Sequence, residues 1–269
     1  MRRRTLTLLV SVMLLTGCAP AAAPSAVPTV PERPSATLEP TRTTAGVLYA
    51  PADLAPDEQQ AWLERIERTS ATVAGAELGT LDDDWDGRIV VELPPSESDY
   101  LALAGPESGE AAATTRCHAE GSRITINPLI GAEPGSYLDA LLLHEAVHAA
   151  TDAACTEAPL WIEEGLAEWL TAQHDPGTQQ ANQQWLDHEL AAGLPSALPT
   201  DAAFRGTSAQ ISGAYALAAF AVAVAIEHLG EDRAMAYFAL PDEQTTSRLT
   251  QWYLAGLRTR SVPTASAPR

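Results

Sequence analysis

Two histidines lie inside an apolar segment that is predicted to be helical, and this combination limits how the segment can fold. The sequence His144-Glu145-Ala146-Val147-His148 is flanked by leucine and alanine, so the helix is apolar nearly all round and belongs in the interior. Buried ionisable side chains need compensation. Because residues four apart share one helical face, both imidazoles can reach a single metal ion that supplies it.

The residues around this pair indicate a zinc hydrolase. Glu145 is placed to accept a proton from a metal-bound water. The next helix is expected to begin after Pro159 and carries three glutamates, Glu163, Glu164 and Glu168. One of these carboxylates would complete a three-ligand Zn²⁺ site, one ion per chain, with one position open. A core helix with paired histidines and no metal is the alternative.

These motifs resemble the gluzincin zinc metallopeptidases, in particular the peptidase MA-like group. The resemblance rests on His144-Glu145-x-x-His148 followed by Trp161-Ile162-Glu163-Glu164-Gly165-Leu166-Ala167-Glu168, and it continues through Tyr215 and His228-Leu229-Gly230 over about residues 56–257. It implies a zinc-dependent peptidase with a zincin-like fold and a peptide or protein substrate. The rival function is a non-catalytic lipoprotein that keeps the zincin scaffold to bind a partner in the cell envelope.

The resemblance also implies roles for single residues. The third ligand in such proteins is the glutamate directly before the glycine, which maps onto Glu164, with Glu163 or Glu168 as alternatives. Glu168 shares a helical face with Glu164, and thermolysin-like relatives hydrogen-bond an acidic residue at this spacing to a metal-binding histidine. Relatives often stabilise the oxyanion with a later tyrosine or histidine, for which Tyr215 is the candidate and a core tyrosine the alternative. The sequence interval between His148 and Glu164 is shorter than the corresponding interval in aminopeptidase-N-like members. The resemblance therefore does not imply exopeptidase activity.

The N-terminus predicts export and a lipid anchor. Residues 1–17 combine a basic start with an apolar run, as in a secretory signal peptide. Leu15-Thr16-Gly17-Cys18 resembles the bacterial lipobox, which implies an acylated Cys18; an ordinary signal peptide with a coincidental cysteine is the alternative. Residues 18–50 are rich in Ala, Pro and Thr and predict a disordered tether. We therefore expect a protein outside the cytoplasm that contacts the membrane only through this lipid.

The rest of the chain predicts an α+β fold over residues 51–258, with a loose tail at 259–269. We expect a small, mostly antiparallel sheet packed on the HExxH helix, followed by a helical C-terminal part. The expected strands are Gly87–Leu93 and Ser122–Asn127, and the expected helices include Ala55–Glu77, Glu231–Leu240 and Glu243–Leu257. The second strand is a candidate edge that could hold an extended peptide. The apolar run Ala214–Ile226 is too short for a bilayer and reads as a core helix.

Two cysteines remain once Cys18 is assigned to lipid. Outside the cytoplasm, Cys117 and Cys155 are expected to form one disulfide, with two buried free thiols as the alternative. Such a bridge would link the connection between the two metal-site helices to the strand region before them.

Composition restricts the partners. The formal net charge of the 269 residues is -19, and all basic residues are arginine. A strongly acidic surface disfavours nucleic acid and anionic bilayers as direct partners. The oligomeric state stays open. The other histidines lie in polar stretches or near a helix end and are not expected to be ligands; they are His118, His174, His188 and His228.

Overall fold

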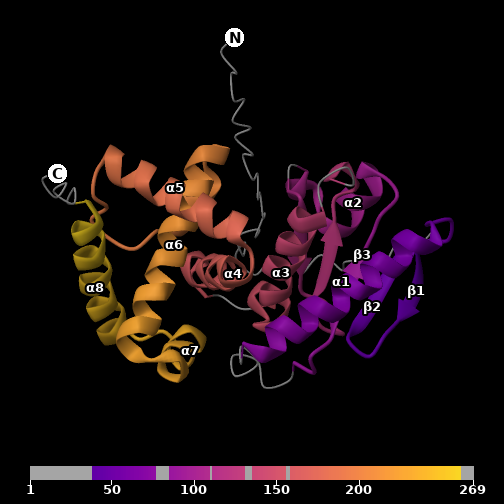
Figure 1. Ribbon diagram of the computed structural model, residues 1–269, viewed down its shortest axis with the longest axis horizontal. Coiled ribbons are helices and arrows are strands. Elements are labelled where there is room, and N and C mark those ends of the chain that lie inside the picture. The colour runs from indigo at the N-terminus through magenta and orange to yellow at the C-terminus, as the bar shows by residue number, and fades with distance from the viewer. Residues whose placement is uncertain (1–37, 77–84, 110, 131–134, 156–157, 262–269) are drawn as a thin grey trace, which may run out of the picture.

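The computed structural model describes residues 38–76, 85–109, 111–130, 135–155 and 158–261. These residues form an α+β fold with one five-stranded sheet and eight α-helices. The sheet lies with α1 to α3 on one side of the molecule, α5 to α8 lie on the other, and α4 runs between the two groups (Figure 1). The predicted signal peptide, Cys18 and the start of the tether lie outside the described residues.

The sheet is mixed, so the expectation of a mostly antiparallel sheet is wrong. Its strands are β1 (Leu38–Arg42), β2 (Gly46–Pro51), β3 (Ile89–Glu92), β4 (Ala113–Arg116) and β5 (Arg123–Ile126), in the order β1-β2-β3-β5-β4. The outer pairs β1–β2 and β4–β5 are antiparallel, whereas β2–β3 and β3–β5 are parallel. Helix α1 (Pro56–Gly75) is the reason for the first parallel pair, because it carries the chain back before β3 begins.

The folded part begins before the expected boundary at residue 51. Strands β1 and β2 occupy Leu38–Pro51, which includes the end of the predicted tether. In β2, Leu48 and Ala50 are buried and point into the core, as alternation in a half-buried strand requires. A side chain at Gly46 would collide with the main-chain oxygen of Ile89, so glycine permits this close strand pairing. The Pro- and Thr-rich composition before Gly46 hid the strand signal.

Strand β5 is interior, and the prediction that it forms an edge is wrong. It pairs with β3 on one side and with β4 on the other. Pro128 follows the strand in the 3-10 turn η3 (Pro128–Ile130), so its missing N–H removes no hydrogen bond from the sheet. The edge next to β5 is β4, a strand that the sequence analysis did not identify.

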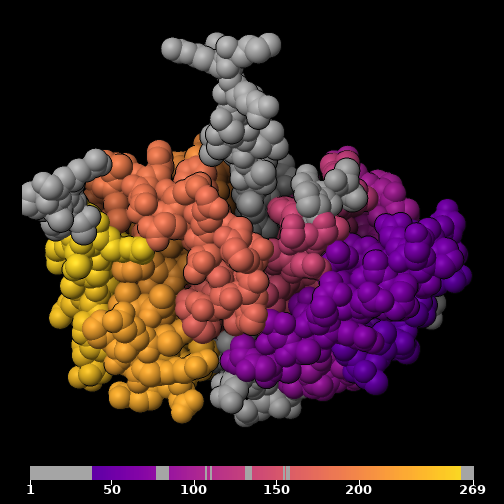
Figure 2. Space-filling view, viewed as in Figure 1, coloured from indigo at the N-terminus to yellow at the C-terminus, as the bar shows by residue number. Residues whose placement is uncertain are grey.

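Helix α3 lies against the sheet and is buried over most of its length. It spans Gly135–Ala150 and packs on β4, β5 and β3, while α1 packs beside it. Helix α2 (Glu97–Ala104) begins after Ser96, whose hydroxyl caps it by accepting a hydrogen bond from the Asp99 N–H at 3.2 Å. On the face in Figure 2, α1 lies beside the junction of α4 and α5. A cavity of about 330 Å³ lies there, and Arg68 and His174 are among the residues that line it.

The C-terminal part is helical, as expected. It contains α4 (Leu160–His174), α5 (Pro176–Ala192), α6 (Ser208–Leu229), α7 (Glu231–Ala239) and α8 (Glu243–Ser261). Helix α8 extends into the predicted loose tail. Within the described residues, α6 is the one helix long and apolar enough to cross a membrane. Most of it is buried against α4, α5, α7 and α8, which fits a core helix.

A disulfide ties the connection between α3 and α4 to the sheet. Cys117 follows β4 directly, and Cys155 ends the 3-10 turn η4 (Ala153–Cys155) that follows α3. The two residues form the predicted bridge, with a Cα–Cα distance of 5.2 Å. The alternative of two free thiols is therefore wrong. The remaining 3-10 turns of the described chain are η2 (Pro106–Ser108) and η5 (Asp201–Arg205).

Candidate metal centre

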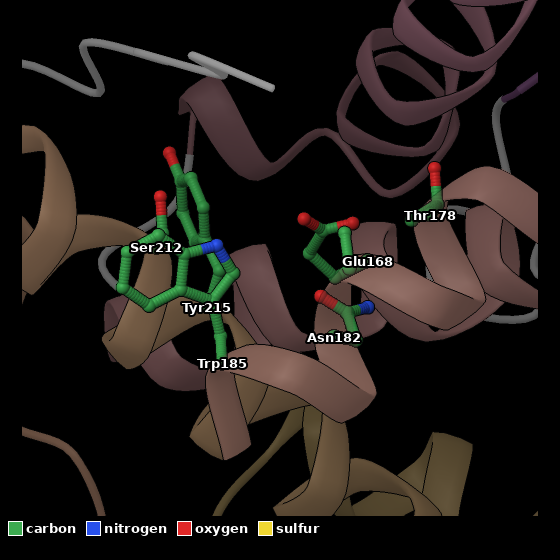
Figure 3. A pocket seen from close by; sticks show the side chains of 7 residues that line it. Glu168, Thr178, Asn182, Trp185, Ser212 and Tyr215 are labelled. Carbon is green, nitrogen blue, oxygen red and sulfur yellow. The ribbon is translucent and has the colours of Figure 1, made fainter. Parts of the chain in front are cut away.

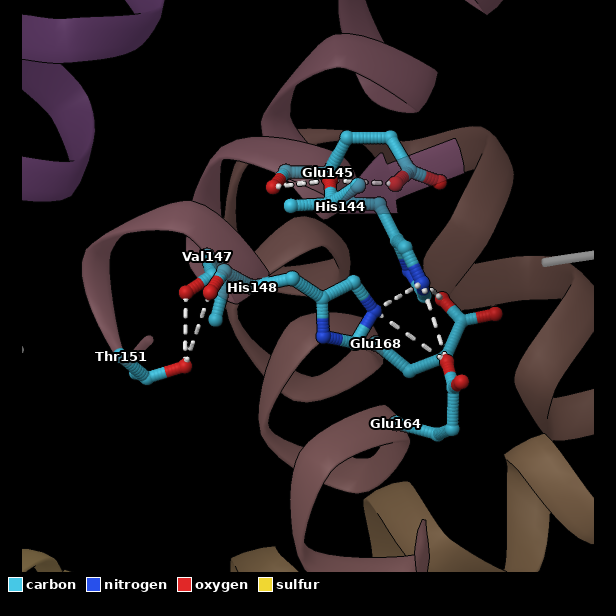
Figure 4. A network of polar contacts seen from close by, with 8 residues as sticks. His144, Glu145, Val147, His148, Thr151, Glu164 and Glu168 are labelled. Atoms are coloured by element: carbon cyan, nitrogen blue, oxygen red, sulfur yellow. Dashed lines mark hydrogen bonds and ion pairs between the residues drawn. The ribbon is translucent and has the colours of Figure 1, made fainter. Parts of the chain in front are cut away.

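Three buried side chains converge between α3 and α4. His144 Nε2 lies 3.2 Å from Glu164 Oε2, and His148 Nε2 lies 3.3 Å from the same oxygen. The two Nε2 atoms are themselves 3.2 Å apart (Figure 4). Each of the three residues is at most 2% exposed. Two imidazole nitrogens and one carboxylate oxygen thus share one small volume, and this donor set fits Zn²⁺.

The helices place these side chains for simple geometric reasons. The four-residue spacing of His144 and His148 puts both rings on one face of α3, with their centroids 4.9 Å apart. Helix α4 packs on that face and contributes Glu164 from near its N-terminal end. Gly165 lets α4 pack closely on α6, because a Cβ there would lie 2.7 Å from the Ala218 oxygen.

The positive charge of His148 and the negative charge of Glu164 stabilise each other. Burial alone would raise the pKa of Glu164, but the charge of His148 and the hydrogen bonds to both histidines hold it well below its usual range. Burial would lower the pKa of His148, but the nearby carboxylates, chiefly Glu164, raise it to about 9. Without a cation the group therefore keeps a proton next to a carboxylate. A divalent cation would replace that proton, because its ligands must be deprotonated.

Glu145 is held beside the group by the edge strand of the sheet. The Thr115 hydroxyl of β4 lies 2.7 Å from Glu145 Oε2 and 3.1 Å from the Glu145 main-chain oxygen. The other carboxylate oxygen, Oε1, is buried and has no hydrogen-bond partner among the described residues. One oxygen is thus anchored while the other is left able to accept a proton. Sequence analysis missed Thr115 because the short polar strand β4 gave no alternating apolar signal.

Glu168 lies close to the site but makes no hydrogen bond to it. Its Oε2 is 4.0 Å from His144 Nδ1, which is ion-pair range and too long for a hydrogen bond. Burial raises the pKa of Glu168, and the charge of His144 opposes this rise. The side chain lines a small cavity of about 20 Å³ together with Asn182 and Tyr215 (Figure 3). Its position fits the predicted role of orienting His144, which stays a prediction.

Tyr215 lies against His144 of the candidate site rather than apart from it. It is buried, and its ring centroid is 6.0 Å from that of His144 in an edge-on arrangement. The Phe204 ring packs on it at 5.7 Å. This placement fits both the predicted oxyanion role and the alternative of a core tyrosine.

The alternative ligand Glu163 points into a different environment. It lines a cavity with Thr151 and Phe238 and is not part of the three-residue group. Burial raises the pKa of Glu163 to about 8; the charge of His148 opposes this, and the charge of Glu164 adds to it. The other four histidines also lie outside the group, and His228 stacks on Trp252 with a centroid distance of 4.6 Å.

Comparison with protein-family models, curated proteins and solved structures finds no match for this chain. The functional proposal therefore depends on the geometry of the site and on the motifs that form it.

Proposed function

We propose that the protein is a surface-anchored, zinc-dependent peptidase with a zincin-like fold. The observation that carries the proposal is the convergence of His144 Nε2, His148 Nε2 and Glu164 Oε2, with the Glu145 carboxylate fixed beside them. The export and lipid anchor rest on residues 1–18, which lie outside the described part of the chain.

The chain's own residues suit peptide hydrolysis. When bound by the three ligands, Zn²⁺ supplies Lewis acidity toward water and toward a carbonyl oxygen. Glu145 Oε1 has no hydrogen-bond partner among the described residues. It takes the proton of the attacking water and passes it to the leaving nitrogen. Thr115 holds the second oxygen, so the carboxylate keeps one orientation while the proton moves. Tyr215 is the proposed donor to the oxyanion.

The sheet offers a way to hold an extended substrate. β4 is the outermost strand on its side of the sheet, and its Thr115 contacts the catalytic carboxylate. A peptide that pairs with the main chain of β4 would therefore pass beside Glu145. This replaces the expectation that residues 122–127 bind the peptide, because β5 already has partners on both sides.

The first experiment measures metal content and cleavage in the processed chain from Cys18 onward, purified in detergent. The Glu145→Gln variant is compared with Glu67→Gln, which makes the same charge change at an exposed position on α1. We expect one zinc per chain in all three proteins and chelator-sensitive cleavage of a peptide library in all but Glu145→Gln. Absence of bound metal after zinc is added would refute the site. Zinc without cleavage in the unmutated protein would favour the non-catalytic scaffold.

A further inference from the structure

A further buried carboxylate, Glu163, lies near the proposed metal centre and lines a cavity outside the three-residue group. The cavity has a volume of about 240 Å³, and Glu163 is the one charged residue among the described residues that line it. Glu163 is 8% exposed. The other lining residues are small, apolar or a threonine: Thr151, Ala153, Ala158, Pro159, Ile162, Leu166, Phe238, Ala239 and Pro241.

The charge of His148 acts on this carboxylate, but no described residue forms a direct ion pair or side-chain hydrogen bond with it. Asp201, which accepts a hydrogen bond from the Leu160 N–H at 3.1 Å, adds a second negative charge nearby. The first turn of a helix favours an acidic residue, but an exposed carboxylate would satisfy that preference equally well. Burial of an unpaired carboxylate is costly, so a cation from outside would stabilise the ionised form of Glu163.

The cavity borders the metal centre. Glu163 directly precedes the ligand Glu164 on α4, and Thr151 lies one turn beyond the ligand His148 on α3. The cavity is thus formed by the ends of the same two helices that carry the ligands, and α7 closes it through Phe238. The charges of His148 and Glu164 act on Glu163, so a group held in the cavity would lie within electrostatic reach of the proposed metal centre.

We propose that this cavity binds a cationic group of the substrate, a guanidinium or an ammonium, which pairs with Glu163. The inference rests on the proposed peptidase function and names its substrate class: peptides with an arginine, a lysine or a free amino terminus next to the cleaved bond. The volume is below the roughly 300–1,000 Å³ of sites for whole small molecules, and it suits one side chain. The apolar walls would contact its methylene groups.

The first test measures binding without metal or cleavage. Chelator-treated processed protein is titrated in a calorimeter with butylguanidine, butylamine and glycinamide, which stand for arginine, lysine and an amino terminus. We expect at least one of them to bind, and to bind about tenfold or more weakly to Glu163→Gln, which loses the charge but keeps the shape. Glu231→Gln, an exposed residue at the far end of α7, should bind as the unmutated protein does. Absence of binding, or equal binding by Glu163→Gln, overturns the proposal.

The second test measures selectivity with zinc present. Matched peptides carry Arg, Lys, Gln or Leu at each position around one cleavable bond, with free or acetylated amino termini. We expect the ratio of kcat/KM for the preferred cationic peptide over its uncharged match to fall about tenfold or more in Glu163→Gln and to stay constant in Glu231→Gln. Cleavage without any cationic preference overturns the inference alone. Binding that depends on Glu163 without cleavage of any peptide overturns the peptidase proposal and leaves the cation site in place.

Discussion

Replacing Gly165 with alanine tests whether the contact between α4 and α6 holds the carboxylate ligand in position. A Cβ at residue 165 would lie 2.7 Å from the Ala218 oxygen, 2.9 Å from the Ala218 carbonyl carbon and 3.0 Å from Val222 Cγ2. Two of these atoms belong to the backbone of α6 and cannot rotate away, so the helices must move apart. Overpacking of this kind costs about 1–3 kcal/mol, while removing a helical glycine returns roughly 0.5–1 kcal/mol.

The expected result for Gly165→Ala is a net loss of about 1 kcal/mol, and at most about 2.5 kcal/mol, in the free energy of unfolding. Urea unfolding of the chelator-treated processed protein, followed by circular dichroism, measures it. Because Glu164 is the neighbouring residue, zinc affinity should fall as well. Gly75→Ala is the matched control, since a Cβ at this exposed helical position meets nothing within 4 Å. It should raise stability by about 0.4–1 kcal/mol. A Gly165→Ala protein as stable as the unmutated one would refute the reasoning.

Three further predictions concern pH, the disulfide and the edge strand. In the metal-free protein, protonated His148 stabilises the fold; this contribution is complete below the unfolded pKa of 6.5 and is lost as pH rises through about 9. Urea unfolding across that interval should show falling stability, and a flat profile would contradict the assignment. The bridge between Cys117 and Cys155 spans a sequence separation of 38, so a double serine variant should lose roughly 3–4 kcal/mol of unfolding free energy, whereas an unchanged value would count against the bridge. Thr115→Val removes the hydrogen bond to Glu145 and should lower kcat/KM about tenfold or more at constant zinc content, while Thr115→Ser should retain activity. Equal activity of the two Thr115 variants would exclude a positioning role.

Features encoded within a few residues could be predicted from the sequence. The spacing of His144 and His148 fixes both rings on one helical face, and Ser96 caps α2 as its position before Asp99 indicates. The disulfide followed from the small number of cysteines. In each case the interacting groups are close in sequence, or no other partner of that type is left.

Features that depend on distant partners could not be predicted. β4 contains only four residues, and its place at the sheet edge depends on pairing with β5. Helix α5 is rich in glutamine and has a weakly apolar face, so its sequence gives no clear helical signal; in the structure it packs on α6. The surroundings of Glu163 depend on Phe238 of α7, far along the chain, so its cavity has no local signature.

The three proposed ligands lie close together in the sequence, and this has a consequence for how the protein folds. His144 and Glu164 are separated by 20 residues in the sequence. His144 lies on α3 and Glu164 on α4, the next α-helix, and the two helices pack against each other. Closing a short loop carries a small entropic penalty, and contacts of low sequence separation form quickly. An ion bound by the proposed ligands would therefore favour docking of α4 on α3 during folding. Metal uptake would then bias the folding route itself, and the ion would act as a nucleus for the domain as well as a cofactor.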